Sequence, residues 1–162
     1  MTRIQVVAAV IHGEHEGSSD HILISQRPNH LHQGGLWEFP GGKIEGHETP
    51  YQGLLRELKE ELDIVVTKAT PLMQITHDYP DKKVSLDIWT VTEFNGLPLG
   101  VEGQEVRWVS LQDLPNFKFP AANQLILARL CDQDEGHLVS LIYSKSSSSS
   151  WPSSNDGSTG IL

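Results

Sequence analysis

The amino-acid sequence predicts an α/β fold, because strand-like stretches alternate along the chain with segments whose apolar residues recur at helical spacing. The strand-like stretches are apolar or alternate apolar with polar residues, which is the period-2 pattern of a half-buried strand. The chain has 162 residues, of which 38% are hydrophobic, enough for one domain with a proper core. Mixed strands and helices indicate α/β layers, and the pattern leaves the strand order open.

Strand-like sequence occurs in the first, middle and later parts of the chain. The predicted strands are residues 4–11, 22–25, 71–77, 84–92 and 106–109. A late helix is predicted after Pro120, where Ala122, Leu125, Ile126 and Leu130 recur at helical spacing. A short apolar segment at residues 137–143 is compatible with an added strand that the pattern does not place. Residues 144–162 are serine-rich, so we expect a folded domain over residues 1–143 and a disordered tail.

The best-specified element is a helix over Pro50–Leu62. Thr49 is a favourable N-cap, Pro50 stands at the first helical position, and Gln52 stands where a capping box places Glu or Gln. The apolar residues of this segment gather on one side, which predicts that the side packs on a core: Tyr51, Leu54, Leu55, Leu58 and Leu62.

The other side of this helix is acidic. Glu57, Glu60 and Glu61 have the spacing i, i+3, i+4, which places them on one face, where like charges repel. A bound cation would offset that repulsion. A Glu-rich face is also typical of an ordinary solvated helix surface, and the spacing alone does not decide between these readings.

A glycine-containing loop precedes the helix, with the sequence LWEFPGGK over residues 36–43. Paired glycines, here Gly41 and Gly42, let the backbone approach a ligand closely. The loop is not a P-loop, since Trp37 stands at the first glycine position of that motif and Ile44 follows Lys43 in place of Ser or Thr. We therefore expect carbonyl oxygens and a lysine beside hard cations and phosphates.

The composition narrows the cellular context and the partners. The formal net charge of −9 argues against binding to nucleic-acid polymers, and it requires divalent cations if the cleft is to accept a polyphosphate. The single Cys131 cannot form an intramolecular disulfide, which favours a reducing compartment. Residues 1–11 lack the features of a signal peptide, and no long apolar span is visible. We expect a monomeric, cytoplasmic protein that does not bind membranes.

The acidic helix and its flanks resemble the Nudix box. Gly42 is followed after five residues by Glu48, and after seven more by Arg56-Glu57-Leu58, one further residue, and Glu60-Glu61. The box normally ends in a glycine, where this chain has Asp63. A glycine there suits a left-handed helix C-cap, which Asp tolerates at a cost of about 1 kcal/mol or less.

The resemblance extends beyond the box, roughly over residues 4–130, and is greatest to the MutT branch of the family. The similar segments outside the box are ISQRP, LWEFPGG, YPDKKVSLDIW, GVEGQEVRWVSL and FPAANQLI. The resemblance implies an α/β/α sandwich with a mixed sheet between helices. It also implies a role in nucleotide-pool sanitation, in which an antimutator enzyme protects DNA replication and complements DNA repair.

The implied activity is metal-dependent hydrolysis of oxidised guanine nucleotides, with 8-oxo-dGTP giving 8-oxo-dGMP and pyrophosphate. The implied cofactor is Mg²⁺, with Mn²⁺ as an alternative, and the implied partner is a small nucleotide. Other readings remain open: a Nudix pyrophosphatase for another nucleoside triphosphate or a nucleotide sugar, a non-catalytic nucleotide-binding regulator, or a purely structural acidic helix.

The resemblance also implies roles for individual residues. The implied metal ligands are the backbone near Gly41 and Gly42 with Glu57, Glu60, Glu61 and Glu102. Either a box glutamate or the distant Glu102 is the implied proton acceptor. Substrate contacts are implied for Arg27, Phe39, Lys43, Lys82 and Asn123. Glu48 and Arg56 are expected behind the ligands, with the arginine pairing with a carboxylate.

Overall fold

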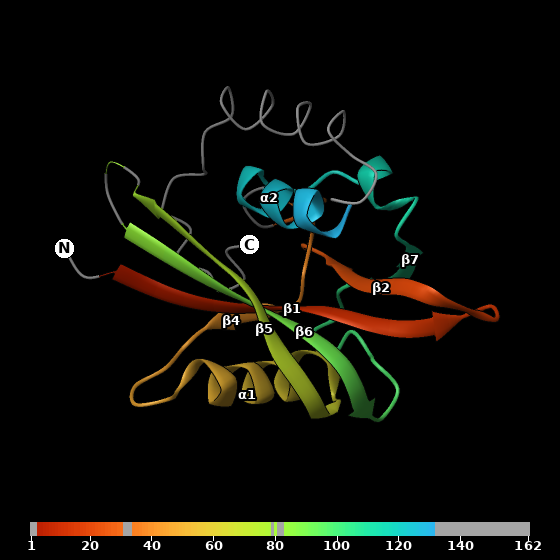
Figure 1. Cartoon of the computed structure of the whole chain (residues 1–162), viewed down its shortest axis with the longest axis horizontal. Helices are drawn as coiled ribbons and strands as arrows, with labels where there is room; N and C mark the ends of the chain where they lie inside the picture. The colour runs from red at the N-terminus through yellow and green to blue at the C-terminus, as the bar shows by residue number, and fades with distance from the viewer. Residues whose placement is uncertain (1–2, 31–33, 79, 81–82, 132–162) are drawn as a thin grey trace.

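The computed structural model describes residues 3–30, 34–78, 80 and 83–131 (Figure 1). Lys82, the segment 137–143 and the tail predicted at 144–162 lie outside these residues. The elements in chain order are β1 (Arg3–His15), β2 (Ser18–Gln26), β3 (Trp37–Glu38), β4 (Gly41–Lys43), α1 (Pro50–Leu62), β5 (Val65–Asp78), β6 (Lys83–Asn95), β7 (Val106–Ser110), a 3₁₀ helix (Leu114–Asn116) and α2 (Ala121–Leu130).

The strands form one mixed sheet, which confirms the fold class predicted from the sequence. The strand order is β3-β2-β1-β6-β5, with β4 paired to β1 and β7 paired to β2. β1 and β6 are parallel, and the other pairs are antiparallel. The central strand β1 therefore joins both halves of the sheet, since its first half pairs with β4 and its second half with β2.

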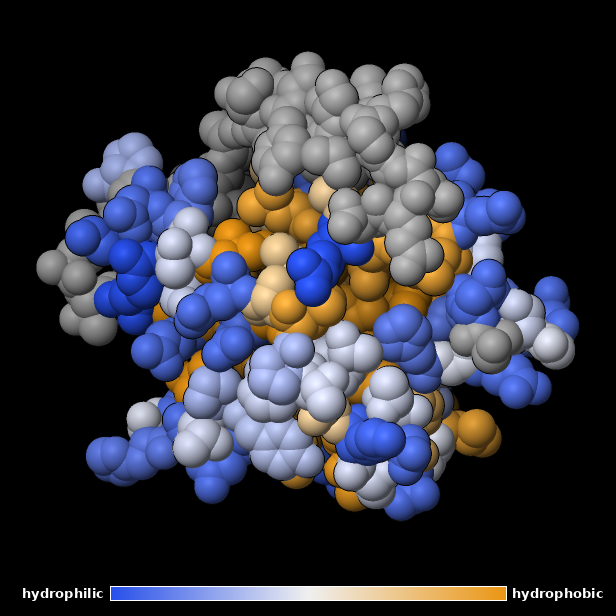
Figure 2. All heavy atoms as spheres, in the orientation of Figure 1, coloured by the Kyte–Doolittle hydropathy of each residue, from blue (hydrophilic) through white to orange (hydrophobic). Residues whose placement is uncertain are grey.

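The two helices cover opposite faces of this sheet (Figure 1). Alternation along β1 sends Val6, Ala8 and Val10 into the core under α2, while the intervening residues enter the core under α1. On the face viewed in Figure 2, apolar side chains lie in a band across the middle of the molecule, framed by hydrophilic ones. The result is an α/β/α sandwich with a core on each side of the sheet.

Helix α1 has the bounds and the capping predicted for it. The Thr49 side chain accepts a hydrogen bond from the Gln52 backbone N–H at 3.1 Å, and the Gln52 side chain accepts one from Thr49 N–H at 2.9 Å. Leu54, Leu58 and Leu62 are fully buried. Asp63 ends the helix in the left-handed conformation, at φ 57° and ψ 41°.

The prediction of a loop over residues 36–43 is wrong in part, because β3 and β4 form within this segment. Strands of two and three residues have no periodic sequence signal, and both depend on distant partners. Gly41 pairs with Ala8, and a Cβ at this glycine would lie 2.0 Å from the Val7 carbonyl oxygen. Its lack of a side chain is thus a packing requirement.

Strand β5 is also longer than predicted, since it begins at Val65 instead of residue 71. It lies at the edge of the sheet, where polar residues such as Lys68 and Thr70 are exposed and obscure the alternation. Across the described ranges no helix is long and apolar enough to span a membrane.

Candidate active site

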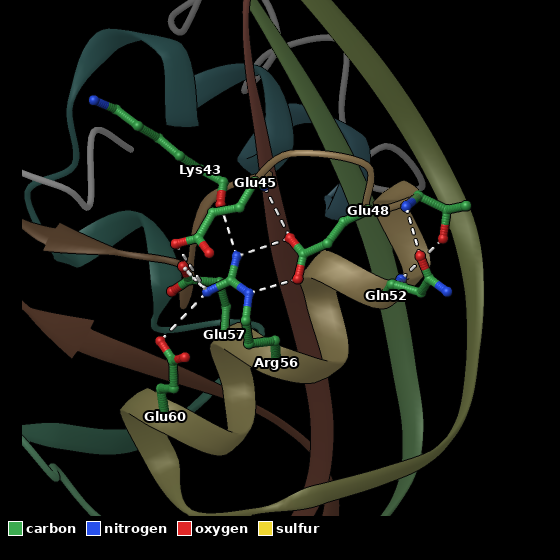
Figure 3. A network of polar contacts seen from close by, with 8 residues as sticks. Lys43, Glu45, Glu48, Gln52, Arg56, Glu57 and Glu60 are labelled. Atoms are coloured by element: carbon green, nitrogen blue, oxygen red, sulfur yellow. Dashed lines mark hydrogen bonds and ion pairs between the residues drawn. The ribbon is translucent and has the colours of Figure 1, made fainter.

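Arg56 is the centre of a polar network on α1 (Figure 3). Its Nε donates to Glu48 Oε2 at 2.6 Å, its Nη2 to the Lys43 carbonyl oxygen at 2.9 Å, and its Nη1 to Glu57 Oε2 at 2.9 Å and Glu60 Oε1 at 3.3 Å. We call Arg56 with these three glutamates the Arg56 cluster. The arginine pairs with carboxylates, as was expected, and also ties the helix to the backbone that leads out of β4.

The members of this cluster differ in burial. The Glu57 side chain is 10% exposed and that of Glu60 is 61% exposed, so only Glu57 lies inside the protein. The hydrogen bond from Arg56 lowers the pKa of Glu48. Burial raises the pKa of Glu57, and the hydrogen bond from Arg56 opposes this rise. A Cβ on Gly42 would lie 2.4 Å from the Glu57 carboxyl carbon, so this glycine makes the room that the carboxylate occupies.

Glu61 belongs to a second group of acids, in which the neighbouring charges that act on Glu61 are those of other carboxyl groups. We call Glu38, Glu61 and Glu102 the inner acid cluster. Burial raises the pKa of Glu61 to about 9, and the negative charges of Glu57, Glu38 and Glu102 add to the rise, against a hydrogen bond from the Gly41 backbone. Burial raises the pKa of Glu38 to about 8, with Arg27 opposing and Glu102 adding to the rise.

The inner acid cluster is assembled by contacts between distant parts of the chain. The Glu61 carbonyl oxygen accepts hydrogen bonds from Val101 N–H at 3.1 Å and from Gln104 Nε2 at 3.2 Å. The Gln104 side-chain oxygen accepts one from Glu102 N–H at 2.9 Å. These bonds hold the loop that carries Glu102 against the C-terminal end of α1.

The chemistry of these residues fits a divalent cation. Carboxylate and carbonyl oxygens are the ligands that Mg²⁺ and similar cations prefer. The raised pKa values of Glu38, Glu57 and Glu61 are caused mainly by burial, which favours the neutral carboxyl group, and a bound cation would favour the ionised form instead. In the part of the chain that is described, no three His, Cys, Asp or Glu side chains are already gathered closely enough to hold a metal. Arg56 accounts for part of this, since it engages Glu57 and Glu60.

The residues expected to contact a base lie on the other side of the sheet. Phe39 is 1% exposed in the core under α2, and its ring stacks on Phe119 with centroids 5.2 Å apart. Asn123 is fully buried on α2, one turn before the core residues Ile126 and Leu127. Neither its Oδ1 nor its Nδ2 has a hydrogen-bond partner. Two unsatisfied polar atoms in a core are costly, so this amide is unusual among the buried side chains.

Arg27 and Glu102 line a pocket of about 390 Å³. Arg27 follows β2 and is 7% exposed, an unusual burial for an arginine. The residues on the β2 side are Gln26, Arg27, Pro28, Asn29 and His30, and those on the other side are Glu102, Gly103, Gln104 and Glu105. Two of the predicted site residues, Arg27 and Glu102, thus meet at one opening.

Lys43 contacts the Arg56 cluster through its backbone. Its carbonyl oxygen accepts a hydrogen bond from Arg56, while its side chain extends away from the Arg56 cluster (Figure 3).

Glu38 is the residue of the inner acid cluster that the sequence analysis missed. The sequence signal that could have found it is an acid between two aromatic residues, Trp37 and Phe39. Successive side chains of a strand point to opposite faces of the sheet, so an acid flanked by two core aromatics faces away from their core.

Comparison with known proteins agrees with this architecture. A family model described as NUDIX domain matches residues 7–129. The 8-oxo-dGTP diphosphatase of Escherichia coli is 36% identical over 130 residues, covering 80% of this chain and 98% of that protein. The enzyme of the same name from Proteus vulgaris is 47% identical over 92 residues, covering 57% and 79%. The CTP pyrophosphohydrolase of Escherichia coli is 37% identical over 123 residues, covering 76% and 87%.

Solved structures give the same result. The chain superposes with a TM-score of 0.71 and 39% identity on a MutT structure from work on Aliivibrio salmonicida and Vibrio cholerae, covering 82% of this chain and 99% of that one. The solution structure of the Escherichia coli ORF135 protein gives a TM-score of 0.67 at 34% identity, covering 80% and 87%. With the family model, these matches show that the chain belongs to the Nudix family.

Proposed function

We propose that this protein hydrolyses oxidised guanine nucleoside triphosphates, foremost 8-oxo-dGTP, to the monophosphate and pyrophosphate. The names of the Escherichia coli and Proteus vulgaris relatives support this substrate, and membership in the Nudix family supports the reaction class. The substrate is a free nucleotide, since the net charge of −9 disfavours nucleic-acid polymers. A monomeric, cytoplasmic enzyme that protects replication from oxidised precursors is part of the same proposal.

The observation that carries the proposal is the unpartnered amide of Asn123. The edge of guanine presents two acceptors, O6 and N7. Oxidation at C8 puts a hydrogen on N7, so the same edge then presents a donor next to an acceptor. An amide side chain offers one donor and one acceptor. Asn123 can therefore pair with both atoms of the oxidised base, but with one of the two in ordinary guanine.

The residues that would hold Mg²⁺ or Mn²⁺ are Glu57, Glu60, Glu61 and Glu102, with the backbone of Gly41 or Gly42. A divalent cation, when bound, supplies the positive charge that neutralises phosphoryl oxygens and positions water for attack on phosphorus.

The chain itself supplies orientation, charge and a proton acceptor. Arg56 fixes the carboxylates of Glu57 and Glu60. A carboxylate of the inner acid cluster, Glu61 or Glu102, accepts the proton of the attacking water. Arg27, Lys43 and Lys82 contribute positive charge toward the anionic substrate, while Phe39 provides an aromatic surface for the base.

A second candidate substrate is CTP. The Escherichia coli CTP pyrophosphohydrolase is as similar to this chain as the 8-oxo-dGTP diphosphatase of that organism, at 37% and 36% identity. Overall identity therefore does not choose between a purine and a pyrimidine. The hydrogen-bonding amide of Asn123 could also pair with cytosine, so the choice rests on measured turnover.

A nucleotide panel with Mg²⁺ tests the proposal. We expect 8-oxo-dGTP to exceed dGTP and CTP in kcat/KM, and we expect an advantage over dGTP of about 10–100-fold from one well-placed bidentate pair. Asn123→Ala should remove most of this advantage, whereas Asn116→Ala, at an exposed position of the 3₁₀ helix, should not. Equal or better turnover of dGTP or CTP by the unaltered protein would overturn the substrate assignment.

A further inference from the structure

Glu38 is a strand residue, but the pairing of its strand does not by itself require an acidic side chain at this position. It lies on β3, where it pairs with Ser25 of β2. Its neighbours Trp37 and Phe39 are both buried in the core under α2. Because successive side chains of a strand point to opposite faces, Glu38 is directed to the α1 side of the sheet, where Glu61 lies.

The carboxyl group of Glu38 is buried and only partly satisfied. Its Oε2 is inaccessible to solvent and accepts no hydrogen bond. Arg27 is a nearby positive charge, but Glu61 and Glu102 bring two negative charges to the same place. A carboxylate in a protein interior normally has a cation or several hydrogen bonds for each oxygen, and leaving one unpaired is costly.

The three acids of the inner acid cluster come from unrelated parts of the chain: a strand, a helix and a loop. Hydrogen bonds from the Val101 backbone and the Gln104 side chain to the Glu61 carbonyl fix the loop, and the pairing of β3 with β2 fixes Glu38. Glu102 is exposed at the edge of this group, whereas the Glu38 Oε2 atom is buried without a hydrogen-bond partner. We propose that Glu38 is a further carboxylate of the cation site, binding the divalent metal together with Glu61 and Glu102.

This inference rests on the proposed cation site and adds to it a residue outside the Nudix box. The competing role for Glu38 is structural, as a counter-charge that holds Arg27. The two roles predict different behaviour. A cation ligand matters when metal is bound and is a source of repulsion when metal is absent, whereas a counter-charge of Arg27 stabilises the fold in both conditions.

Calorimetric titration of the full chain with Mn²⁺ tests the inference, using the unaltered protein, Glu38→Gln and Glu38→Ala. We expect either variant to raise the Kd for Mn²⁺ by at least about tenfold, the lower end of effects seen for residues that support metal sites. Glu93→Gln, an exposed acid on β6, is the matched control and should leave the Kd unchanged. The Ala variant removes the carboxyl group without placing an amide there, so it protects the test against misfolding of the Gln variant.

Thermal unfolding of the same proteins gives the second measurement. With EDTA, Glu38→Gln should unfold at the same temperature as the unaltered protein or higher, and the increase in Tm caused by Mn²⁺ should shrink. An unchanged Kd in a folded variant, or an equal loss of Tm with and without Mn²⁺, overturns the inference and leaves the proposed function intact. If the unaltered protein does not bind Mn²⁺, the proposed cation site itself is wrong.

Discussion

The Arg56 cluster and the inner acid cluster lie next to one another, and they differ in whether a guanidinium donates hydrogen bonds to their carboxylates. In the first, hydrogen bonds from a guanidinium lower the pKa of Glu48 and restrain that of Glu57. In the second, burial and mutual repulsion raise the pKa of Glu38 to about 8 and that of Glu61 to about 9. Adjacent residues of one helix, Glu60 and Glu61, fall into different clusters.

The difference shows that glutamates of one sequence motif have different roles, which depend on the surroundings of each side chain. Glu57 and Glu60 are bonded to Arg56, which also holds the helix on the β4 segment. Glu38 and Glu61 are instead kept largely protonated by burial, so a divalent metal that binds them would displace protons. The sequence presents Glu57, Glu60 and Glu61 as one acidic face, whereas the fold separates them.

The largest expected effect is on turnover. Glu61→Gln should lower kcat for 8-oxo-dGTP by at least about 10²–10³-fold, the scale of losing one preorganised electrostatic group at a reacting centre. Glu60→Gln should cost less, because its side chain is largely exposed and already bonded to Arg56. Pyrophosphate release measured at saturating Mg²⁺ compares the two variants, with circular dichroism as the control for folding. Equal losses would remove the distinction between the clusters.

The next effect is on stability. Arg56→Ala should lower the free energy of unfolding by about 2–3 kcal/mol, because it leaves Glu57 buried beside Glu48 without their shared donor. Arg56→Lys should recover part of this loss, since lysine keeps the charge but lacks the planar fork of donors.

Urea unfolding measures these differences. The matched control is Arg107→Ala, which removes an exposed bond to Glu105 and a contact with the Trp37 ring at 5.1 Å. We expect that variant to cost about 1 kcal/mol or less. A smaller loss at Arg56 than at Arg107 would mean that the Arg56 cluster does not stabilise the helix.

A further effect is expected on the pH dependence of stability without metal. The carboxyl groups of Glu38 and Glu61 have pKa values of about 8 and 9 in the folded protein, against about 4.5 when unfolded. Between these values the unfolded chain binds fewer protons, so stability falls as the pH rises from about 5 to 9. Glu48, with its lowered pKa, acts in the opposite direction below about 4.5. Thermal unfolding in EDTA should show the fall, and Glu61→Gln should flatten it.

Local rules account for what could be predicted from the sequence. The bounds of α1, its capping box and the left-handed Asp63 depend on residues within one turn of each other. The alternation in β1 and the apolar core of β6 are also local signals. These features sufficed for the fold class and for the acidic helix.

Features that depend on distant contacts could not be predicted. β3 and β4 are too short to have a period and exist through pairing with β2 and β1. The approach of Glu102 to Glu61 depends on hydrogen bonds across 40 or more residues. Glu38 has a local signal, an acid between two aromatic residues, but its place beside the other acids depends on the pairing of β3 with β2.

The most direct test of the account is the number of protons released when Mg²⁺ binds. At pH 7.5 the raised pKa values of Glu38 and Glu61 keep these carboxyl groups largely protonated, so a cation that binds them must displace protons. Calorimetry in two buffers with different ionisation enthalpies measures this. We predict release of about one to two protons per Mg²⁺, and Glu61→Gln should reduce this number by about one. Binding without proton release would contradict the claim that the inner acid cluster is the cation site.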